Sequence, residues 1–441
     1  PKPQTPNPKP QTPNPICNSL VEKKRAIFQL IYRMFNKIQL MFKGLKGCQS
    51  CDHDIYKRAK DEASADAVAW VFKNKKEFVP YYFNFPALKP DEIRARILYT
   101  GLCHSDVSSG REEWGPVKFP LCAGHEVICQ ITDIGTDVKN CKVGEIVGYG
   151  PFRTACFNCK LCNQGIENQC CTLPMEERQI YGIHFGGYAT HLQQPASHVI
   201  HLPAGIDIRT APPLLCAGTT VFAPMTRWIK DPKASVAIIG IGGLGHLAIK
   251  YGKAMGNRVT AITTASDKVE LLKSMGADEV ILCDETYSEL LNHKHKFDFV
   301  LNMLYVKPEL IELFLSTLCN CGTYMQIGLP NIKNKINFGF QDFVTRQLNF
   351  VGTCDGTIKE TTNAVNYAHK HGIKVDCEFF DFEDFPQALE KLENNRPHFR
   401  CVVNVKDYND CCFPLKEELK NPEESTSGKI MNMLNILSHQ G

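Results

Sequence analysis

The chain has 441 residues, of which 43% are hydrophobic and 22% charged, as expected of a soluble globular protein with a sizeable core. This length allows two or three domains. The formal net charge of +3 gives no argument for nucleic-acid binding, and the sequence lacks the run of about 18 apolar residues that a transmembrane helix needs. We expect a cytoplasmic protein, and an organellar location stays open because the sequence starts at Pro1 instead of Met.

Residues 1–66 are expected to form an extension ahead of the main body. Residues 1–15 repeat PKPQTPN and predict a Pro-rich tail without regular fold. In residues 21–46 apolar residues recur at steps of four and three, which predicts a helix with one apolar face and many cations. This basic helix either packs on the body, or binds an anionic membrane surface or a protein partner, or is a transit remnant.

The main body changes in character along the chain. Residues 67–211 are rich in short strand-like stretches bounded by glycine, such as EIRARILYTG. In residues 212–352 strand-like runs alternate with helix-length segments, which predicts a parallel, doubly wound sheet. These runs are 235–239, 258–262, 279–282, 297–301, 324–327 and 348–351. Residues 353–405 return to mixed helix and strand, and residues 406–441 are assigned to a polar tail without fold.

The stretch TACFNCKLCNQGIENQCC, residues 154–171, spaces four cysteines closely: Cys156, Cys159, Cys162 and Cys170. The chain has 21 cysteines and no sign of secretion, so we expect reduced thiols, whereas CxxC pairs would form disulfides in an oxidising compartment. Four thiolates on one loop predict a closed tetrahedral zinc site that stabilises the loop and does no chemistry. Cys171 is expected to take no part.

The stretch SVAIIGIGGLGH, which begins at residue 235, carries a GxGxxG pattern between a strand and a helix, the context that dinucleotide binding requires. The first glycine permits a tight turn, the second lets the backbone approach a pyrophosphate, and the third allows close helix packing. We assign the cofactor contacts to Gly240, Gly242, Gly243, Leu244, Gly245, Thr263, Thr264, Lys268 and Thr220.

The segment TAITTASDK, at the end of the second strand, favours NADP over NAD. An NAD enzyme presents an Asp or Glu there to hold the ribose hydroxyls, but here no acid occurs before Asp267. The hydroxyls of Thr263 and Thr264 and the cation of Lys268 would instead accept a 2′-phosphate.

Three further fragments each offer one good zinc ligand: Cys103 in GLCHSD, His125 in AGHEV and Cys216 in LLCAGTT. Taken singly, each cysteine is better explained as a core residue and the histidine as a satisfied polar group. Together with the four-cysteine loop and the glycine motif, two Cys and one His predict a catalytic zinc with its fourth position open.

The order of these motifs along the chain is GLCHSD, GHE, the four-cysteine loop, LLCAGTT and GIGGLG. In this order the sequence resembles the zinc-dependent medium-chain alcohol dehydrogenases over residues 67–405, most closely their cinnamyl-alcohol-dehydrogenase-like branch. The resemblance implies an α/β fold with a GroES-like, β-rich catalytic domain (67–211 with 353–405), a Rossmann NADP-binding domain (212–352), and N- and C-terminal extensions. It also implies a homodimer, and hydride transfer between NADP(H) and a primary alcohol or aldehyde substrate.

The same resemblance implies two zinc ions per chain: a catalytic one on Cys103, His125 and Cys216, and a structural one on the four-cysteine loop. Glu126 would lie beside the catalytic metal and exchange with water as a ligand. The other implied roles are orientation of the zinc-bound histidine by Asp106, a place near the cofactor phosphates for His104, and the start of the proton relay at Ser105.

Two departures from the family pattern limit what can be carried over. Many plant members have a histidine three residues after the relay hydroxyl, whereas this chain has Ser108, so the proton must leave through the cofactor ribose and His104 or through solvent. The loop 170–187 is also shorter, so monolignol specificity is not expected. The alternatives are a structural or interaction subunit and zinc-free quinone reduction, and the complete ligand set argues against both.

Overall fold

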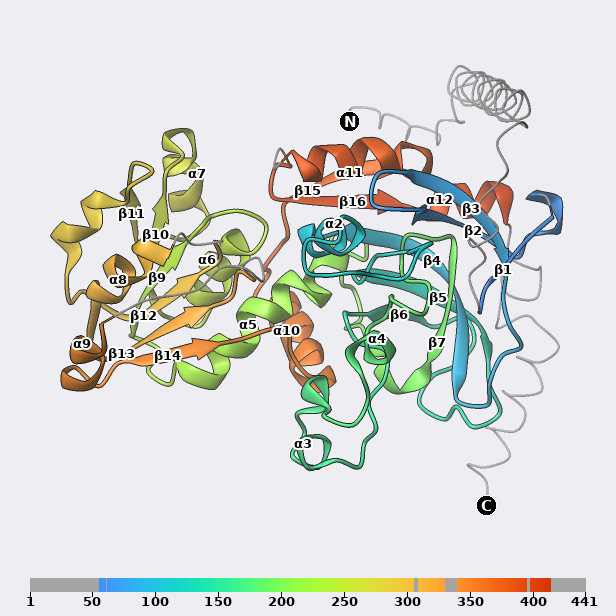
Figure 1. Ribbon diagram of the computed structural model, residues 1–441, viewed down its shortest axis with the longest axis horizontal. Coiled ribbons are helices and arrows are strands. Elements are labelled where there is room, and N and C mark those ends of the chain that lie inside the picture. Colours follow the sequence, from blue (N-terminus) through green and yellow to red (C-terminus); the bar gives the residue numbers. More distant parts are fainter. Residues whose placement is uncertain (1–54, 61, 305–307, 330–338, 395–396, 414–441) are drawn as a thin grey trace, which may run out of the picture. The chain divides into compact units, whose positions relative to one another are not determined.

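The computed structural model describes residues 55–60, 62–304, 308–329, 339–394 and 397–413 (Figure 1). The Pro-rich tail and the basic helix predicted for residues 21–46 lie outside these ranges, as does most of the polar tail, and all three stay predictions. Within the described part of the chain, no helix combines the length and the apolar character needed to cross a membrane.

Six parallel strands form the first large sheet, as the alternating pattern predicted, in the order β11-β10-β9-β12-β13-β14 (Figure 1). The strands are β9 (Ser235–Ile239), β10 (Arg258–Thr263), β11 (Glu279–Leu282), β12 (Phe297–Asn302), β13 (Leu318–Gln326) and β14 (Asn349–Gly352). The order reverses between β9 and β12, which is where nucleotides bind in doubly wound sheets. Strand β13 starts six residues earlier than the 324–327 run, because its polar beginning hides it from a pattern search.

The helices in this part of the chain, from residue 217 to residue 370, are α5 (Ala217–Trp228), α6 (Gly245–Ala254), α7 (Val269–Ser274), α8 (Pro308–Ser316), α9 (Phe340–Thr345) and α10 (Ile358–Lys370). Helix α6 follows β9 directly through the glycine motif. Helix α5 begins at the residue after Cys216 and packs against α10. The segment that leads into the parallel sheet is therefore in contact with the segment that follows its last strand.

The second large sheet has seven strands in the order β15-β16-β4-β5-β6-β8, with β7 also paired to β4. The strands are β4 (Glu92–Leu102), β5 (Val127–Ile134), β6 (Ile146–Tyr149), β7 (His191–Pro195), β8 (Ile200–His201), β15 (Cys377–Asp381) and β16 (Arg400–Asn404). Strand β16 lies antiparallel to β4, with Cys401 opposite Leu102. The last strand of the described chain therefore completes a sheet that the first third of the chain begins.

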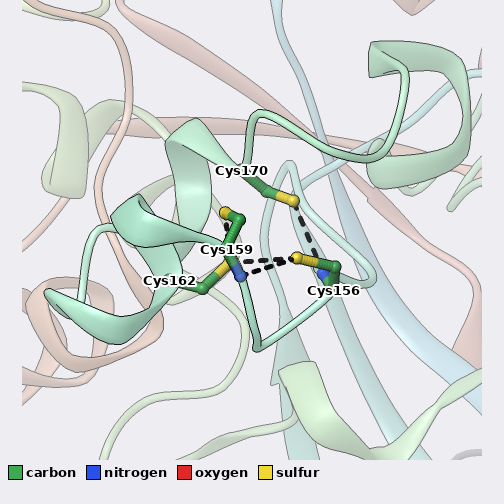
Figure 2. A group of neighbouring side chains, drawn as sticks. All are labelled: Cys156, Cys159, Cys162 and Cys170. Carbon is green, nitrogen blue, oxygen red and sulfur yellow. Dashed lines mark hydrogen bonds between the residues drawn. The ribbon is translucent and has the colours of Figure 1, made fainter.

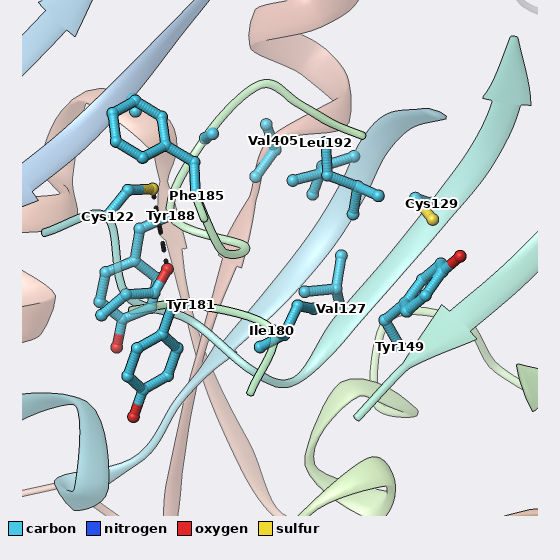
Figure 3. Packing of buried hydrophobic residues seen from close by; sticks show 14 of the residues in the cluster. Cys122, Val127, Cys129, Tyr149, Ile180, Tyr181, Phe185, Tyr188, Leu192 and Val405 are labelled. Carbon is cyan, nitrogen blue, oxygen red and sulfur yellow. Dashed lines mark hydrogen bonds between the residues drawn. The ribbon is translucent and has the colours of Figure 1, made fainter. Parts of the chain in front are cut away.

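A small sheet of β1 (Lys57–Arg58), β2 (Ala67–Phe72) and β3 (Phe78–Asn84) packs with the second large sheet around one buried core. Figure 3 shows part of this core, where Tyr149, Phe185 and Tyr188 lie among aliphatic side chains. The helices here are α2 (His104–Gly110), α3 (Lys160–Asn163), α4 (Met175–Arg178), α11 (Phe385–Glu393) and α12 (Lys406–Cys412). The core fixes the strand ends from which the functional side chains project.

Two ends of the fold differ from expectation. Residues 55–66 were assigned to the extension, but Tyr56 is buried in the core and β1 pairs with β3. Residues 406–412 were assigned to the tail, but they form α12. The side chain of Asn409 donates to the carbonyl oxygens of Ile97 and Thr190, both at 2.9 Å, and so ties this helix to β4. A single buried amide of this kind leaves no periodic signal in the sequence.

Candidate metal and cofactor sites

The structure brings together the residues predicted for the open metal site. Ligand atoms of Cys103, His125, Glu126 and Cys216 all lie within 4.8 Å of one another. Each comes from the end of an element: Cys103 precedes α2, His125 and Glu126 precede β5, and Cys216 precedes α5. His125 Nε2 lies 3.2 Å from Cys216 Sγ. Two sulfurs, one imidazole nitrogen and a nearby carboxylate are donors that suit zinc, so the residues present fit this metal.

Asp106 is the buried group that holds His125 in position. Its Oδ1 lies 2.9 Å from His125 Nδ1 and also accepts from the backbone N–H of Gly124 at 2.9 Å. Its Oδ2 accepts from the Cys103 N–H at 3.1 Å and from the Tyr188 hydroxyl at 2.8 Å. With Nδ1 engaged, Nε2 is left to face the cluster, which is the orientation that a metal-bound histidine needs.

Charges and hydrogen bonds within the cluster shift the pKa values of its members in different directions. A hydrogen bond with Cys216 lowers the pKa of Cys103 well below its usual range, which favours the thiolate, the form that binds metals. Burial opposes a charge on His125, but the adjacent Asp106 carboxylate outweighs that effect and raises the pKa of His125.

Glu126 has a partner that sequence reasoning missed. Arg400, the first residue of β16, forms an ion pair with Glu126 Oε1, and both side chains are almost fully buried. Burial raises the pKa of Glu126 to about 7, and the Arg400 charge opposes this rise. The sequence signal was a lone arginine at the start of an apolar run, RCVV. Tyr188, the phenol that bonds Asp106, was also missed and had no comparable signal.

The groups considered for proton transfer lie on α2. Ser105 is half-buried, and its Oγ accepts from the Cys103 thiol at 3.5 Å, so its hydroxyl lies beside the metal cluster. His104 is half-buried next to it. Ser108 is buried and its hydroxyl donates to Glu113 at 2.6 Å, so it does not extend a relay from Ser105.

Figure 2 shows the cluster of Cys156, Cys159, Cys162 and Cys170 around α3. The sulfur of Cys162 lies 3.8 Å from that of Cys156 and 3.5 Å from that of Cys159. Sulfurs bound to one tetrahedral zinc at about 2.3 Å stand about 3.8 Å apart, so the spacing fits zinc. A backbone hydrogen bond from Cys162 lowers the pKa of Cys159 to about 5. Cys171 is exposed and lies outside this group of four metal-ligating side chains.

The glycine motif has the geometry of a phosphate cradle. Gly240 has φ +87°, a left-handed value, and a Cβ on Gly245 would meet the Gly240 carbonyl oxygen at 2.3 Å. Gly242 is exposed, and a Cβ there would meet nothing within 4 Å, so the loop leaves room for a ligand above the start of α6. A Cβ on Gly243 would approach the Arg400 side chain to 2.9 Å. The cradle and the metal cluster therefore share Arg400 as a neighbour.

The residues predicted to read the 2′-phosphate lie at the end of β10. Thr263 is buried and its hydroxyl accepts from the Ala265 N–H at 3.1 Å, whereas Thr264 is exposed. The Lys268 ammonium lies 5.5 Å from the ring centre of Phe399, and that ring stacks on His246 at 4.7 Å. Lys268 is thus held beside the glycine motif, and Thr264 is free to meet a ligand.

Two families match the chain along its length. Residues 89–204 match the alcohol dehydrogenase GroES-like domain, and residues 243–370 match the zinc-binding dehydrogenase domain. The aldehyde reductase AdhA of Synechocystis is 33% identical over 326 residues, which cover 74% of this chain and 94% of the relative. The chain belongs to the zinc-binding alcohol dehydrogenases.

Further relatives within this family include several cinnamyl alcohol dehydrogenases. Cinnamyl alcohol dehydrogenase 8 of Arabidopsis thaliana is 31% identical over 335 residues, 74% of this chain and 91% of the relative. A solved cinnamyl alcohol dehydrogenase of Sorghum bicolor aligns with TM-score 0.71 and 28% identity, covering 77% of this chain and 97% of its own. The structure of CAD from Helicobacter pylori complexed with NADP(H) aligns with TM-score 0.69 and 27% identity, covering 77% of this chain and 98% of its own. The predicted family, fold class and oxidoreductase activity are confirmed.

Proposed function

We propose that this zinc-binding alcohol dehydrogenase interconverts aldehydes and primary alcohols with NADP(H), and that Cys103, His125 and Cys216 hold its catalytic zinc. The observation that carries the proposal is the open cluster, in which Asp106 fixes the imidazole and Cys103 favours the thiolate. The names of relatives support the substrate class, since they include an aldehyde reductase and cinnamyl alcohol dehydrogenases.

A zinc ion bound by these ligands would polarise a carbonyl oxygen, and NADPH would supply the hydride. The chain's own residues then position and protonate. Ser105 lies against the Cys103 sulfur and is the candidate to pass a proton to the substrate oxygen. Because the Ser108 hydroxyl donates to Glu113, a proton would be returned to Ser105 through His104 and the ribose of a bound cofactor, or from solvent.

NADP is proposed over NAD on the residues that follow β10. The exposed Thr264 and the cation of Lys268 suit a 2′-phosphate, and no carboxylate precedes Asp267 to repel it. A neighbouring solved structure bound to NADP(H) supports this choice. Two zinc ions per chain are proposed because the two ligand clusters share no residue.

A screen of NADPH oxidation over aldehydes, together with elemental analysis, tests the proposal. We expect turnover with medium-sized aldehydes, a preference for NADPH and close to two zinc ions per chain. An intact, zinc-loaded protein that turns over no aldehyde would favour the structural or interaction role instead. Reduction of quinones by the zinc-free protein would favour a quinone reductase.

We propose that residues 212–352 form the Rossmann domain and that residues 67–211 and 353–405, together with the flanking β1 and α12, form the catalytic domain. Pairing of β15 with β16, and of β16 with β4, supports the return of the chain to the catalytic domain. A homodimer is proposed through the edge strand β14 and the neighbouring apolar side chains of Leu329, Phe340 and Val344, which are 53%, 75% and 70% exposed.

For residues 21–46 we propose attachment to an anionic membrane surface or to an acidic partner. A shortened chain tests this, and it should start at Ile55, because Tyr56 is buried and a later start would remove β1. Retained activity with loss of sedimentation on anionic vesicles would support attachment, and loss of the thermal transition would show that the segment belongs to the fold. A cytoplasmic location fits the free thiols of every described cysteine.

A further inference from the structure

A carboxylate that sequence analysis did not single out lies beside the catalytic cluster. Asp355 stands between β14 and α10, and its Oδ1 accepts a hydrogen bond of 3.1 Å from the Thr220 hydroxyl. Thr220 is on α5, four residues after Cys216, and four helical residues advance about 6 Å. The carboxylate is close enough for electrostatic interaction with Cys216, His125 and Cys103.

The backbone holds Asp355 in one place. A Cβ on the next residue, Gly356, would meet the Thr219 side chain at 2.5 Å, so the segment packs tightly on α5. Asp355 itself has φ +50°, a left-handed value that Asp and Asn tolerate better than other side chains. Asp355 is half-buried and its neighbour Cys354 is exposed. An anchored carboxylate therefore borders accessible space next to the metal ligands.

Asp355 differs from the buried carboxylates of the catalytic domain in its lack of a counter-charge. Glu92, Asp106 and Glu126 each form an ion pair with a buried arginine or histidine. Within the described ranges, no Lys, Arg or His makes an ion pair with Asp355, whose side-chain partners are one hydroxyl and one thiol. A carboxylate can accept about four hydrogen bonds, so capacity remains. Burial raises the pKa of Asp355, and the charge of His125 and the hydrogen bonds from Thr220 and Cys354 oppose this rise only in part.

We propose that Asp355 is a specificity-determining residue that selects aldehydes carrying an ammonium group a few carbons from the carbonyl. The inference rests on the proposed function, because the carbonyl oxygen must lie at Cys103, His125 and Cys216 while the other end of the substrate meets Asp355. The ammonium group supplies the missing counter-charge and donates to the unfilled lone pairs of the carboxylate. A neutral aldehyde of the same length does neither.

The test compares 3-aminopropanal with butanal, in which a methyl group replaces the ammonium group, by kcat/KM with NADPH in the full chain. We expect the wild type to prefer 3-aminopropanal and Asp355→Asn to lower the ratio by about 10- to 100-fold, the usual range for a hydrogen bond to a charged group. Asparagine keeps an acceptor for Thr220 and tolerates the backbone conformation. Asp133→Asn, an exposed position on β5, is the matched control and should leave the ratio unchanged.

A second measurement needs no variant: the wild-type preference for 3-aminopropanal should weaken as salt screens the charge pair. Normal reduction of butanal with an unchanged ratio in Asp355→Asn would overturn the specificity role and leave the proposed function standing. A raised KM for NADPH with an unchanged aldehyde ratio would overturn it too, because Asp355 would then serve the cofactor. No turnover of either aldehyde by zinc-loaded wild type would overturn the proposed function itself.

Discussion

Replacing Arg400 with methionine should destabilise the protein strongly, because it strips a buried carboxylate of its counter-ion. The side chains of Arg400 and Glu126 are 6% and 0% exposed, and the second carboxylate oxygen of Glu126, Oε2, has no hydrogen-bond partner. Breaking one side of such a pair costs about 3–5 kcal/mol, most of it from the unpaired charge. We expect Arg400→Met to lower the free energy of unfolding, measured by urea denaturation at neutral pH, by about this amount.

The double variant Arg400→Met/Glu126→Leu separates charge from packing. Two apolar side chains of similar volume often replace a buried ion pair at little cost, so the double variant should recover to within about 1 kcal/mol of the wild type. The deficit of the single variant should also shrink as pH falls. Burial already raises the pKa of Glu126 from 4.5 to about 7, and without the arginine nothing opposes it, so the carboxyl takes up a proton and loses its charge. Destabilisations that add in the double variant, or a deficit that grows in acid, would refute this reasoning.

The remaining predictions concern the metals, the cofactor and the assembly. Cys159→Ser should remove one zinc and lower Tm, whereas Cys216→Ser should remove the other zinc and abolish turnover with the thermal transition intact; elemental analysis and calorimetry check both, and loss of both metals together would contradict the two-site account. Lys268→Glu should cut the NADPH-over-NADH ratio of kcat/KM by a factor equivalent to about 1–3 kcal/mol, and an unchanged ratio would reject its 2′-phosphate contact. Phe340→Glu should yield monomers in analytical ultracentrifugation, and a persistent dimer would exclude the β14 edge as the interface.

Motifs that depend on spacing were predictable from the sequence. The GxGxxG pattern, the four-cysteine loop and the three scattered ligands need particular residue types at particular positions, so each leaves a local signature. The family resemblance added the roles of Ser105 and Asp106, which spacing alone does not give. It did not reveal that Ser108 is turned toward Glu113, because that depends on a turn at the end of α2.

The groups that complete the site were not predictable, because their partners are far away in the sequence. Arg400 reaches Glu126 across 274 positions, and Asp355 reaches Thr220 across 135. A lone arginine in an apolar run hints at a buried partner but does not say which one. The buried positions of Asn409 and Tyr56 were not predicted for the same reason, since a single buried contact produces no periodic pattern in the sequence.

The pairing of β16 with β4 sets the order in which the chain can become an enzyme. During translation β4 is synthesised early. The edge of β4 along Tyr99–Leu102 has no strand to pair with until the ribosome has synthesised β16, about 300 residues later. An unpaired strand edge is prone to pair with other chains, and Glu126 waits equally long for Arg400. A nascent chain that ends within the Rossmann domain therefore has an unpaired strand edge on β4 and no counter-charge for Glu126. We expect chaperones or proteases to bind such a chain, and we do not expect it to be an active, smaller dehydrogenase.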